Sequence, residues 1–518
     1  MPTNQKTKPV RNLVERLGLP TDGSSGLTAR DLAVEISGID YDSRAVQPGH
    51  AFFCIEGQKM DGLKFIPDAV ARGAACVFSQ RAPENAPDVP VIVVPDTKLA
   101  LALAADEFYD HPSRSMRLIG VTGTNGKTTT THLVQHILCH AGKKAALIGT
   151  LGARLAEDDG SSTYIDMHHT TPQASDLQAM LAEMVQKRQA YVAMEVSSHA
   201  LALARVGGCN FAVACLTNVT QDHLDFHRTM ENYWKSKRML FEQLVESKQS
   251  NKTAVINLDD PIAREFMNAV TGDVKLWTYG WEAPADAHVV SAEFDFKGTR
   301  LSLNTPAGPV TMRLKLNGRF NVYNVMSAVL IALAEGIDLQ TCKEALENFG
   351  GVPGRFESVG SASPDQAHEE PLCIVDYAHT PDGLDNVLKA ARALVPQGGR
   401  LIVVFGCGGD RDSSKRPQMG EIAESRADDL VVTSDNPRSE DPQKIIADIL
   451  AGIRRMKNVD VEPDRTSAIN LAVQRASGKD IIVVAGKGHE TYQILADRTI
   501  DFDDRIEVQK ALARRGQN

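Results

Sequence analysis

The sequence predicts an α/β fold with three domains. The chain has 518 residues, too many for one domain of the usual size of about 100–200 residues. Short apolar runs alternate with segments whose apolar residues recur at helical spacing, which is typical of parallel sheets covered by helices. A polar segment, 361–370, interrupts this alternation before it restarts. We therefore expect an N-terminal domain over 1–112, a central domain over 113–356 and a C-terminal domain over 357–518.

The composition is that of a globular protein. Apolar residues make up 42%, charged residues 24%, and the net charge is −10, which argues against nucleic acid as a partner. The eight cysteines form no CxxC pair and lie mostly in apolar runs, which indicates free thiols and a cytoplasmic location. The N-terminus lacks the apolar core of a signal peptide, and no run approaches the ~20 apolar residues of a membrane span.

The first domain is predicted to be a small α/β unit. Turn signals such as Gln47-Pro48-Gly49 separate its short β-rich runs, and His111-Pro112 ends its helical stretch. The expected strands are 34–39, 51–55, 75–78 and 91–94, and the expected helix is 98–109.

The second and third domains are predicted to hold mainly parallel sheets. In the central domain we expect strands 118–122, 145–149, 191–194, 211–216 and 254–257, and a helix 128–141 that ends at Gly142. The C-terminal domain is predicted to be a doubly wound, Rossmann-like unit. Its expected strands are 372–376, 401–405, 430–433 and 481–485, and its expected helices are 383–394, 419–427, 443–453 and 467–476.

A phosphate-binding loop is the strongest local signal. The segment 120–129, Gly-Val-Thr-Gly-Thr-Asn-Gly-Lys-Thr-Thr, follows a predicted strand and opens a helix, so its backbone N–H groups can cradle phosphate oxygens. Lys127 can reach the β- and γ-phosphates, and the Thr128 hydroxyl can bind Mg²⁺. The strict P-loop pattern has glycine at position 121, where this chain has Val121, so the loop is a variant. The predicted ATP contacts here are Gly123, Thr124, Asn125, Gly126, Lys127, Thr128 and Thr129.

Glu195 ends the predicted strand 191–194. A carboxylate at the end of a strand that faces a phosphate loop is a common Mg²⁺ ligand. A single glutamate in such a place is otherwise a solvated cap, and a single histidine in a polar loop, such as His223, is more often structural.

Several motifs together resemble the Mur ligases, the ATP-dependent amino-acid ligases of bacterial cell-wall precursor synthesis. The resemblance covers essentially the whole chain, and the order of the motifs agrees with the family's nucleotide-sugar, ATP and amino-acid domains. Besides the phosphate loop, the motifs are Glu195-Val196-Ser197-Ser198-His199, Thr217-Asn218, Asp222-His223-Leu224-Asp225, Asn321-Val322-Tyr323-Asn324, Val352-Pro353-Gly354-Arg355-Phe356-Glu357 and Asp376-Tyr377-Ala378-His379-Thr380-Pro381.

The resemblance implies roles for individual residues. Two Mg²⁺ ions would be held by Thr128, Glu195, His223 and a carbamate that CO₂ forms on Lys237, with the nearby Lys235 a surface charge. The segment with Asn321 and Asn324 would lie beside the adenine, and Arg355 would contact ATP. The implied catalytic residues are Lys127, His223 and Lys237.

The resemblance also implies a nucleotide substrate. Tyr41-Asp42-Ser43-Arg44 and 57–62 are similar to the uridine-binding segment of the member that extends UDP-N-acetylmuramoyl-L-alanyl-D-glutamate. Two positions depart from the family pattern, since His169 and Leu203 stand where Asn and Gln are often found. The implied contacts are Tyr41, Ser43, Gln58, Lys59, Met60, His169, Thr170, Thr171, Ser197, Leu203 and Arg205.

The tetrad Asp435-Asn436-Pro437-Arg438 is similar to members that add meso-2,6-diaminopimelate. The guanidinium of Arg438 can bind a distal carboxylate through two parallel hydrogen bonds, whereas lysine would bring an ammonium to it. As bare sequence the tetrad is only a turn after a strand. The implied contacts are Arg411, Asp435, Asn436, Pro437, Arg438, Gly486 and Glu490.

The predicted activity is ATP-dependent amide formation through an acyl phosphate. The substrates would be ATP, the nucleotide dipeptide and meso-diaminopimelate, and the chain would act as a monomer. The alternatives are an L-lysine-adding ligase, a folylpolyglutamate synthase, or a P-loop NTPase switch or motor that binds a partner protein. The first domain and the Asp435–Arg438 tetrad tell against the first two.

Overall fold

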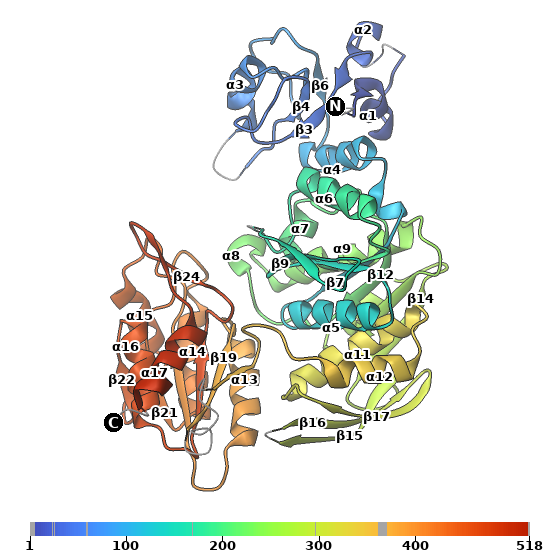
Figure 1. The fold of residues 1–518 in the computed structure, drawn as a ribbon. Coiled ribbons are helices and arrows are strands. Elements are labelled where there is room, and N and C mark those ends of the chain that lie inside the picture. The colour runs from blue at the N-terminus through green and yellow to red at the C-terminus, as the bar shows by residue number, and fades with distance from the viewer. Residues whose placement is uncertain are drawn as a thin grey trace.

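The computed structural model describes residues 6–22, 24, 26–57, 61–167, 169–295, 297–360 and 370–515. Three α/β units are visible in Figure 1: an N-terminal unit at the top, a central unit below it, and a C-terminal unit beside the central one. The candidate residues Gln58, Lys59 and Met60 and the polar segment 361–369 lie outside the described residues.

The N-terminal unit is built on a parallel sheet of four strands in the described part of the chain. The rings of Phe53 and Phe78 stack in its core at 4.3 Å. The strand expected over 34–39 is wrong as one element, because Ser37 lies where the chain leaves a two-stranded ribbon and enters the sheet. The elements are β1 (Lys8–Pro9), α1 (Val10–Arg16), α2 (Ala29–Leu32), β2 (Glu35–Ile36), β3 (Gly38–Asp40), β4 (His50–Phe53), η1 (Gly62–Phe65), α3 (Ile66–Ala71), β5 (Cys76–Ser79), β6 (Val91–Val93), α4 (Thr97–Phe108) and η2 (Pro112–Arg114).

The central unit contains a sheet of eleven described strands that is parallel in its middle and antiparallel at both ends. The antiparallel strands were not predicted; in Ala287–Asp295, for example, all residues after Ala287 are exposed or half-buried and there is no long apolar run. In spatial order the strands are β10 (Ser162–Ile165), β9 (Gly152–Ala156), β8 (Ala145–Gly149), β11 (Tyr191–Glu195), β7 (Arg117–Thr122), β12 (Phe211–Leu216), β13 (Thr253–Asn257), β14 (Lys275–Gly280), β15 (Ala287–Asp295), β16 (Gly298–Thr305) and β17 (Gly308–Leu314).

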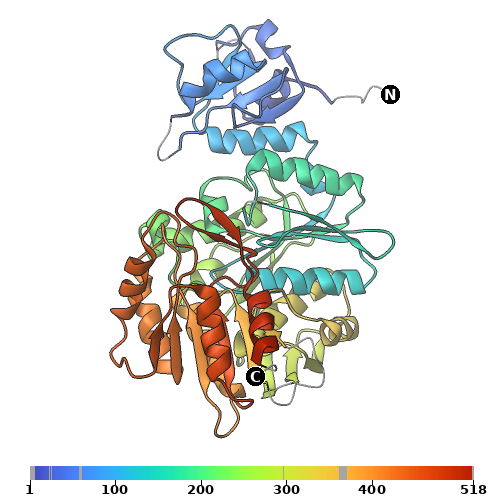
Figure 2. The same cartoon turned by 60° about the vertical axis from the view of Figure 1, so that its left-hand side comes forward.

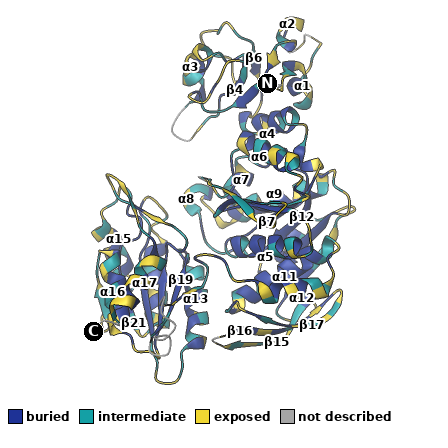
Figure 3. Ribbon diagram, in the orientation of Figure 1, coloured by how far each residue is buried: buried dark blue, intermediate teal, exposed yellow. Residues whose placement is uncertain are grey.

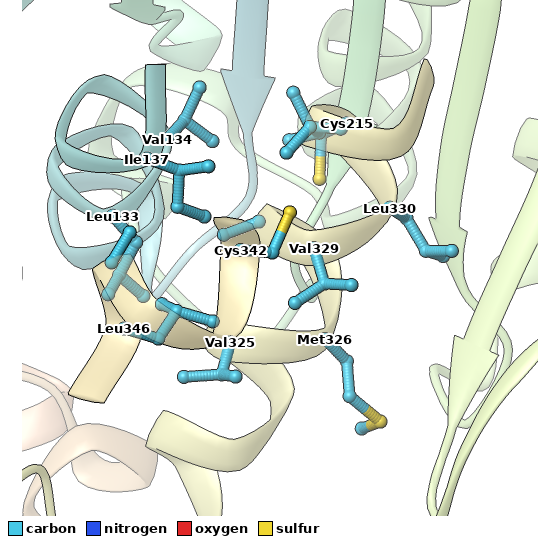
Figure 4. Packing of buried hydrophobic residues seen from close by; sticks show 14 of the residues in the cluster. Leu133, Val134, Ile137, Cys215, Val325, Met326, Val329, Leu330, Cys342 and Leu346 are labelled. Atoms are coloured by element: carbon cyan, nitrogen blue, oxygen red, sulfur yellow. The ribbon is translucent and has the colours of Figure 1, made fainter. Parts of the chain in front are cut away.

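Helices cover both faces of the central sheet. One face packs against α5 (Lys127–His140), α11 (Arg319–Ala334) and α12 (Leu339–Asn348), as Figure 4 shows for the apolar side chains between them. Successive strand residues serve opposite faces, since Ile119 and Val121 belong to this core and Leu118 to the other. The remaining helices are α6 (Ala174–Gln186), α7 (Ser198–Ala202), α8 (Leu224–His227), α9 (Met230–Glu246) and α10 (Ala263–Met267). Helices α4 and α6 lie against each other and join the N-terminal and central units (Figure 2).

The C-terminal unit is a doubly wound sheet of six described strands, and the inner strands of the sheet are mostly buried in Figure 3. Its spatial order is β18 (Glu357–Val359), β19 (Leu372–Asp376), β23 (Ile481–Ala485), β20 (Leu401–Phe405), β21 (Asp429–Val432) and β22 (Val459–Val461). One face packs against α13 (Pro381–Leu394), α14 (Lys415–Arg426) and α15 (Pro442–Leu450), and the other against α16 (Arg465–Arg475) and α17 (Asp504–Arg515). A hairpin of β24 (Tyr492–Ile494) and β25 (Thr499–Asp501) lies outside this sheet.

The predicted α/β class is confirmed, and the strands expected in the central and C-terminal units coincide with observed ones to within one residue. Helix α14 begins at Lys415, not at 419, because a proline such as Pro417 is tolerated in the first turn of a helix. All eight cysteines, each within the described residues, are free thiols. None of the helices described is both long and apolar enough to cross a bilayer. The domain boundaries at 112 and 356 stay predictions.

Candidate active site

The phosphate loop runs from the end of β7 to the start of α5, as the sequence pattern predicts. Gly123 and Gly126 have φ values of 147° and 87°, which side chains rarely adopt. A Cβ on Gly123 would lie 1.9 Å from the Thr217 hydroxyl, and one on Gly126 would lie 2.4 Å from Asn324 Oδ1. The two glycines are therefore required for this close approach of the loop to β12 and α11.

Lys127 is folded back onto the loop. Its Nζ donates to the carbonyl oxygens of Gly123 and Thr124, at 2.9 Å each. Burial lowers the pKa of Lys127, because the protein interior solvates a charge less well than water does. A phosphate group would offer this ammonium stronger acceptors than two neutral carbonyls do.

Glu195 is fully buried and is held from three sides. Its carboxylate accepts from the hydroxyl of Thr128 at 3.0 Å and from the backbone N–H and hydroxyl of Thr150 at 2.8 and 3.1 Å. Our sequence reasoning missed Thr150, although a polar residue directly after predicted strand 145–149 was a usable signal. These contacts orient the carboxylate toward the first turn of α5.

A cavity of about 730 Å³ opens beside the loop, between the central and C-terminal units. Its polar part includes Lys127, Thr128, Glu195, His223 and Arg355. Its apolar part is formed by β15, α11 and α13, through Phe294, Phe320, Tyr323, Val387, Ala390, Ala393 and Leu394. The cavity therefore joins a phosphate-binding end to an end that suits a flat ring.

Two contacts tie the C-terminal unit to the phosphate loop. Arg355 Nη2 donates to the Thr128 hydroxyl at 3.2 Å, and its guanidinium stacks over Tyr377 at 4.3 Å. Asp382, which sequence reasoning also missed, accepts from the Asn125 side chain at 2.8 Å. Arg355 lies just before β18 and Asp382 in the first turn of α13, so both contacts lie where the central and C-terminal units meet.

Lys237 and Lys235 differ sharply in environment. Lys237 lies in the middle of α9, is 1% exposed, and donates to Gly123 O at 2.7 Å. Burial, reinforced by the Lys127 charge, lowers the pKa of Lys237 well below its usual value. The side chain of Lys235 is 50% exposed and pairs with Glu231.

His223 stands in a cluster of imidazoles and one carboxylate. Its ring lies 4.7 Å from that of His199, and its Nε2 lies 3.4 Å from Asp222 Oδ2. Burial lowers the pKa of His223 to about 3 despite Asp222, so the ring is a neutral imidazole that could bind a cation.

Asn321 and Asn324 are both buried in α11, and Asn324 lies next to Gly126 of the phosphate loop. Asn324 Nδ2 donates to Asn321 Oδ1 at 3.1 Å, and the Thr130 hydroxyl donates to Asn324 Oδ1 at 3.4 Å. Asn321 Nδ2 donates to the Asn317 carbonyl oxygen at 2.8 Å. In this arrangement Asn324 borders the cavity beneath Gly126.

The predicted nucleotide-dipeptide contacts lie in two groups. Tyr41, with buried Ser43 beside it, follows β3 and donates to Asp176 of α6 at 3.1 Å, which links the N-terminal and central units. In the central unit, Thr171 O accepts from Arg205 at 3.0 Å, and the Thr171 hydroxyl donates to Glu195 O at 2.8 Å. Thr170 and Ser197 border the cavity, Leu203 is half-buried, and His169 is exposed.

The predicted amino-acid contacts gather at the carboxyl ends of β20, β21 and β23. Asn436 Nδ2 donates to Glu490 Oε2 at 2.8 Å, and the fully buried Lys487 donates to the same oxygen at 2.9 Å. Arg438 has a φ of 53°, and its Nη1 donates to Gly409 O at 2.8 Å. Asp435 Oδ2 would lie 2.5 Å from a Cβ on Gly486, and Pro437 is buried beside them. Arg411 is exposed at the rim.

The loops that carry the predicted amino-acid contacts, 408–411, 435–438 and 486–490, are named the amino-acid loops. They are separate from the cavity in this structure. Of the described residues that line the cavity, none comes from 408–411, 435–438 or 486–490.

The side chains near the phosphate end fit Mg²⁺ better than a transition metal. Within the described ranges there is no group of three His, Cys, Asp or Glu side chains able to hold a metal ion. Mg²⁺ keeps several waters and takes one or two carboxylates together with substrate phosphates. The Thr128 hydroxyl and the Glu195 carboxylate provide such a partial set.

Comparison with family models matches most of the chain. Residues 35–109 match "Mur ligase family, catalytic domain", 121–332 match "Mur ligase middle domain", and 354–488 match "Mur ligase, glutamate ligase domain". A protein of Gloeobacter violaceus is 48% identical over 95% of this chain and 97% of its own length. The chain belongs to the Mur ligase family. It is therefore a ligase, and ATP dependence is a property of this family.

Two relatives and one solved structure share the same name. The Gloeobacter protein and one of Syntrophomonas wolfei, 46% identical over 91% of this chain and 93% of that protein, are both named UDP-N-acetylmuramoyl-L-alanyl-D-glutamate–2,6-diaminopimelate ligase. A solved structure with this name has a TM-score of 0.67 and 32% identity, and covers 98% of this chain and 99% of its own. A folylpolyglutamate synthase of Mycobacterium tuberculosis, with a TM-score of 0.60 and 18% identity over 75% of this chain and 92% of its own, shares the fold alone.

Proposed function

We propose that this Mur ligase joins meso-2,6-diaminopimelate to the D-glutamate of UDP-N-acetylmuramoyl-L-alanyl-D-glutamate, in peptidoglycan precursor synthesis. The observation that carries this proposal is the grouping of Asn436, Arg438 and Glu490 at one sheet edge. That grouping occurs in a chain that is 46–48% identical to relatives named for this reaction.

The charges of the amino-acid loops suit a substrate with an amino-acid centre at each end. Arg438 can bind the distal carboxylate of diaminopimelate through two parallel hydrogen bonds, and Glu490 can accept from an ammonium. L-Lysine would bring an ammonium to Arg438 instead, which is repulsive. Arg411 and Asp435 would complete the contacts.

ATP would lie along the cavity beside the phosphate loop. The backbone of 123–129 and the ammonium of Lys127 would bind the phosphates, and Arg355 would neutralise them from the C-terminal unit. The apolar wall that includes Phe320, Ala390 and Leu394 supports the adenine lying there. Asn321 and Asn324 would then act by holding the loop, since their side chains bond to neighbouring groups.

Mg²⁺ would be held by the Thr128 hydroxyl and the Glu195 carboxylate, and a second ion by His223 and a carbamate on Lys237. The ions would supply positive charge that offsets the charge developing on the transferred phosphoryl group.

The carbamate would form on the uncharged amine of Lys237. Its nitrogen bonds to the carbon of CO₂ and loses one proton, which leaves an anionic carbamate. The lowered pKa of Lys237 supports this step, because only the neutral amine has the electron pair that the bond needs. Lys235 lacks this burial.

The reaction would proceed in two transfers. An oxygen of the D-glutamate γ-carboxylate attacks the γ-phosphorus of ATP, and the bond to ADP breaks. The neutral amine of diaminopimelate then attacks the acyl carbon, loses a proton, and displaces inorganic phosphate. Thr170, Thr171, Ser197 and Arg205 would hold the dipeptide, and closure of the C-terminal unit would exclude water from the acyl phosphate.

The proposal also includes the oligomeric state of the protein and its location in the cell. Phosphate loop and amino-acid loops come from one chain, so a monomer has all the parts the reaction needs. The eight free thiols support a location in the cytoplasm, which is a reducing compartment and contains nucleotides.

The test measures ADP formation from ATP in reactions from which one substrate at a time is omitted. We expect turnover only when the nucleotide dipeptide, Mg²⁺ and meso-diaminopimelate are all present, and little with L-lysine in its place. Equal or better turnover with L-lysine would support the lysine-adding alternative. ATP hydrolysis that needs neither amino acid nor dipeptide would support an NTPase switch.

A further inference from the structure

Two arginines are the largest fully buried side chains among the residues that the structure describes, and both lie beneath the amino-acid loops. Arg416 pairs with Glu440 and Asp448. Arg465, the first residue of α16, donates to the backbone directly before two of these loops.

Arg465 uses its whole guanidinium. Its Nε and Nη2 donate to the two carboxylate oxygens of Asp504 at 2.7 Å each, and both side chains are 0% exposed. The remaining donors reach backbone carbonyls: Nη1 donates to Ser434 O at 3.3 Å, and Nη2 to Ala485 O at 3.0 Å. Ser434 directly precedes the loop 435–438, and Ala485 directly precedes the loop 486–490.

These two loops follow strands that do not pair with each other. In the sheet, β20 lies between β21 and β23 and pairs with both, and its ladders end at Val432 and Ala485, so the loops that follow lie beyond the last paired residues. The loops nevertheless approach closely, since Asn436 donates to Glu490 at 2.8 Å. Arg465 is a rigid link beneath them that spans the end of β20.

The charge of this link also matters. Burial lowers the pKa of Arg465, but Asp504 and, further away, Asp435 and Glu490 raise it, so the guanidinium stays charged. A fully buried ion pair adds little net stability over an apolar pair of similar volume. The planar guanidinium of Arg465 binds a carboxylate and two backbone carbonyls, and it is therefore well suited to fixing the distances between them. A lysine ammonium cannot replace it in this role.

We propose that Arg465, held by Asp504, is a positioning residue of the amino-acid site. It sets the separation between the loop with Asn436 and Arg438 and the loop with Glu490, and thereby the fit for an amino acid that is charged at both ends. The inference rests on the proposed function, because the amino acid it concerns is the one proposed above.

The chain contains a matched control at the opposite edge of the same sheet. Arg400 joins the amino ends of the same two strands: Nη1 donates to Asp429 Oδ2 at 2.7 Å, and Nη2 to Asp480 Oδ2 at 2.8 Å. Like Arg465 it links the two strands, but it binds two different carboxylates, its side chain is 42% exposed, and it stands at the sheet edge opposite to the amino-acid loops.

The experiment compares Arg465→Lys, Asp504→Asn and Arg400→Lys in the full-length chain. For each variant, KM for meso-diaminopimelate, KM for ATP, kcat and the midpoint of urea unfolding are measured. For Arg465→Lys we expect KM for diaminopimelate to rise about 10- to 100-fold while KM for ATP changes less than about 2-fold. Asp504→Asn should raise the same KM about 3- to 10-fold, and Arg400→Lys should change only the unfolding midpoint.

An unchanged KM for diaminopimelate in folded Arg465→Lys overturns the inference, as does an equal rise in Arg400→Lys. If Arg465→Lys does not fold, Asp504→Asn decides by the same criterion. If neither folds, the pair is a requirement of the fold alone and the inference is overturned. Wild-type protein that forms no ADP with diaminopimelate would contradict the proposed function instead, which separates the two failures.

Discussion

Lys127 and Lys237 donate hydrogen bonds to one acceptor, the carbonyl oxygen of Gly123, at 2.9 and 2.7 Å. Two ammonium groups this close repel each other, and desolvation disfavours both charges, most strongly that of the fully buried Lys237. Loss of a proton from Lys237 relieves the repulsion, and a carbamate would replace it with attraction. The shared carbonyl thus explains why two lysines can stand beside one phosphate loop.

Replacing Lys237 by alanine should nearly abolish ligation, and Lys235→Ala should be mild. If Lys237 is a carbamate, short carboxylates such as acetate should partly restore the activity of Lys237→Ala, because they supply the missing oxygen ligands. Turnover is measured with and without added carboxylate. If Lys237→Ala and Lys235→Ala lost equal activity, and added carboxylates restored none of it, the two lysines would be a basic patch.

Lys127→Ala should lower kcat by about 10²- to 10³-fold or more, because a cation that faces the transferred phosphoryl group is lost. The fold should survive, since Nζ bonds only to loop carbonyls. Turnover and circular dichroism are measured together. Normal turnover in a folded variant would contradict the assignment of the loop.

Arg438→Ala should reduce kcat/KM for diaminopimelate by roughly 30- to 1000-fold, which corresponds to about 2–4 kcal/mol for a lost charge-assisted bidentate contact. KM for ATP should change little. The preference for diaminopimelate over lysine should narrow, since the repulsive guanidinium is gone. We would abandon the proposed role if the ratio of kcat/KM for the two amino acids stayed unchanged.

Thr150→Val should raise the Mg²⁺ concentration needed for half-maximal activity by about 10-fold, because a hydroxyl that orients Glu195 is lost. The backbone N–H of residue 150 still donates, so kcat at saturating Mg²⁺ should stay near the wild-type value. A Mg²⁺ titration of turnover checks this. An equal loss of activity at every Mg²⁺ concentration would contradict an orienting role.

His132 should make the protein less stable in acid. Burial lowers the pKa of His132 to about 4 from its usual 6.5, so the unfolded chain binds more protons between these values and stability falls as pH falls. From about pH 7 to about pH 5 this histidine should cost about 2 kcal/mol of unfolding free energy. Urea unfolding of wild type and His132→Gln at both pH values measures the difference, with the more exposed His140→Gln on the same helix as control.

If His132→Gln and wild type lose the same unfolding free energy over this range, the imidazole is not the group that titrates. The hydrogen bond from His132 Nδ1 to Thr128 O, 2.8 Å long, should be retained by the glutamine amide, so a large loss at neutral pH is not expected.

The sequence alone determined the α/β class, the phosphate loop and the strands with continuous apolar runs. Each of these depends on local rules: a glycine-rich turn between a strand and a helix, or a run of apolar residues long enough to be buried on both faces. The antiparallel strands β15 and β17 were missed because their half-exposed faces give a weak apolar pattern.

Only the tertiary structure decided which polar residues act together. Lys235 and Lys237 are two positions apart in the sequence, yet the turn of α9 exposes one and buries the other beside Gly123. Thr150 reaches Glu195, and Arg465 reaches Ser434 and Ala485, across strands that are distant in the chain. Such contacts arise from helix rotation and strand order, which packing of the whole core selects, so local sequence patterns do not contain them.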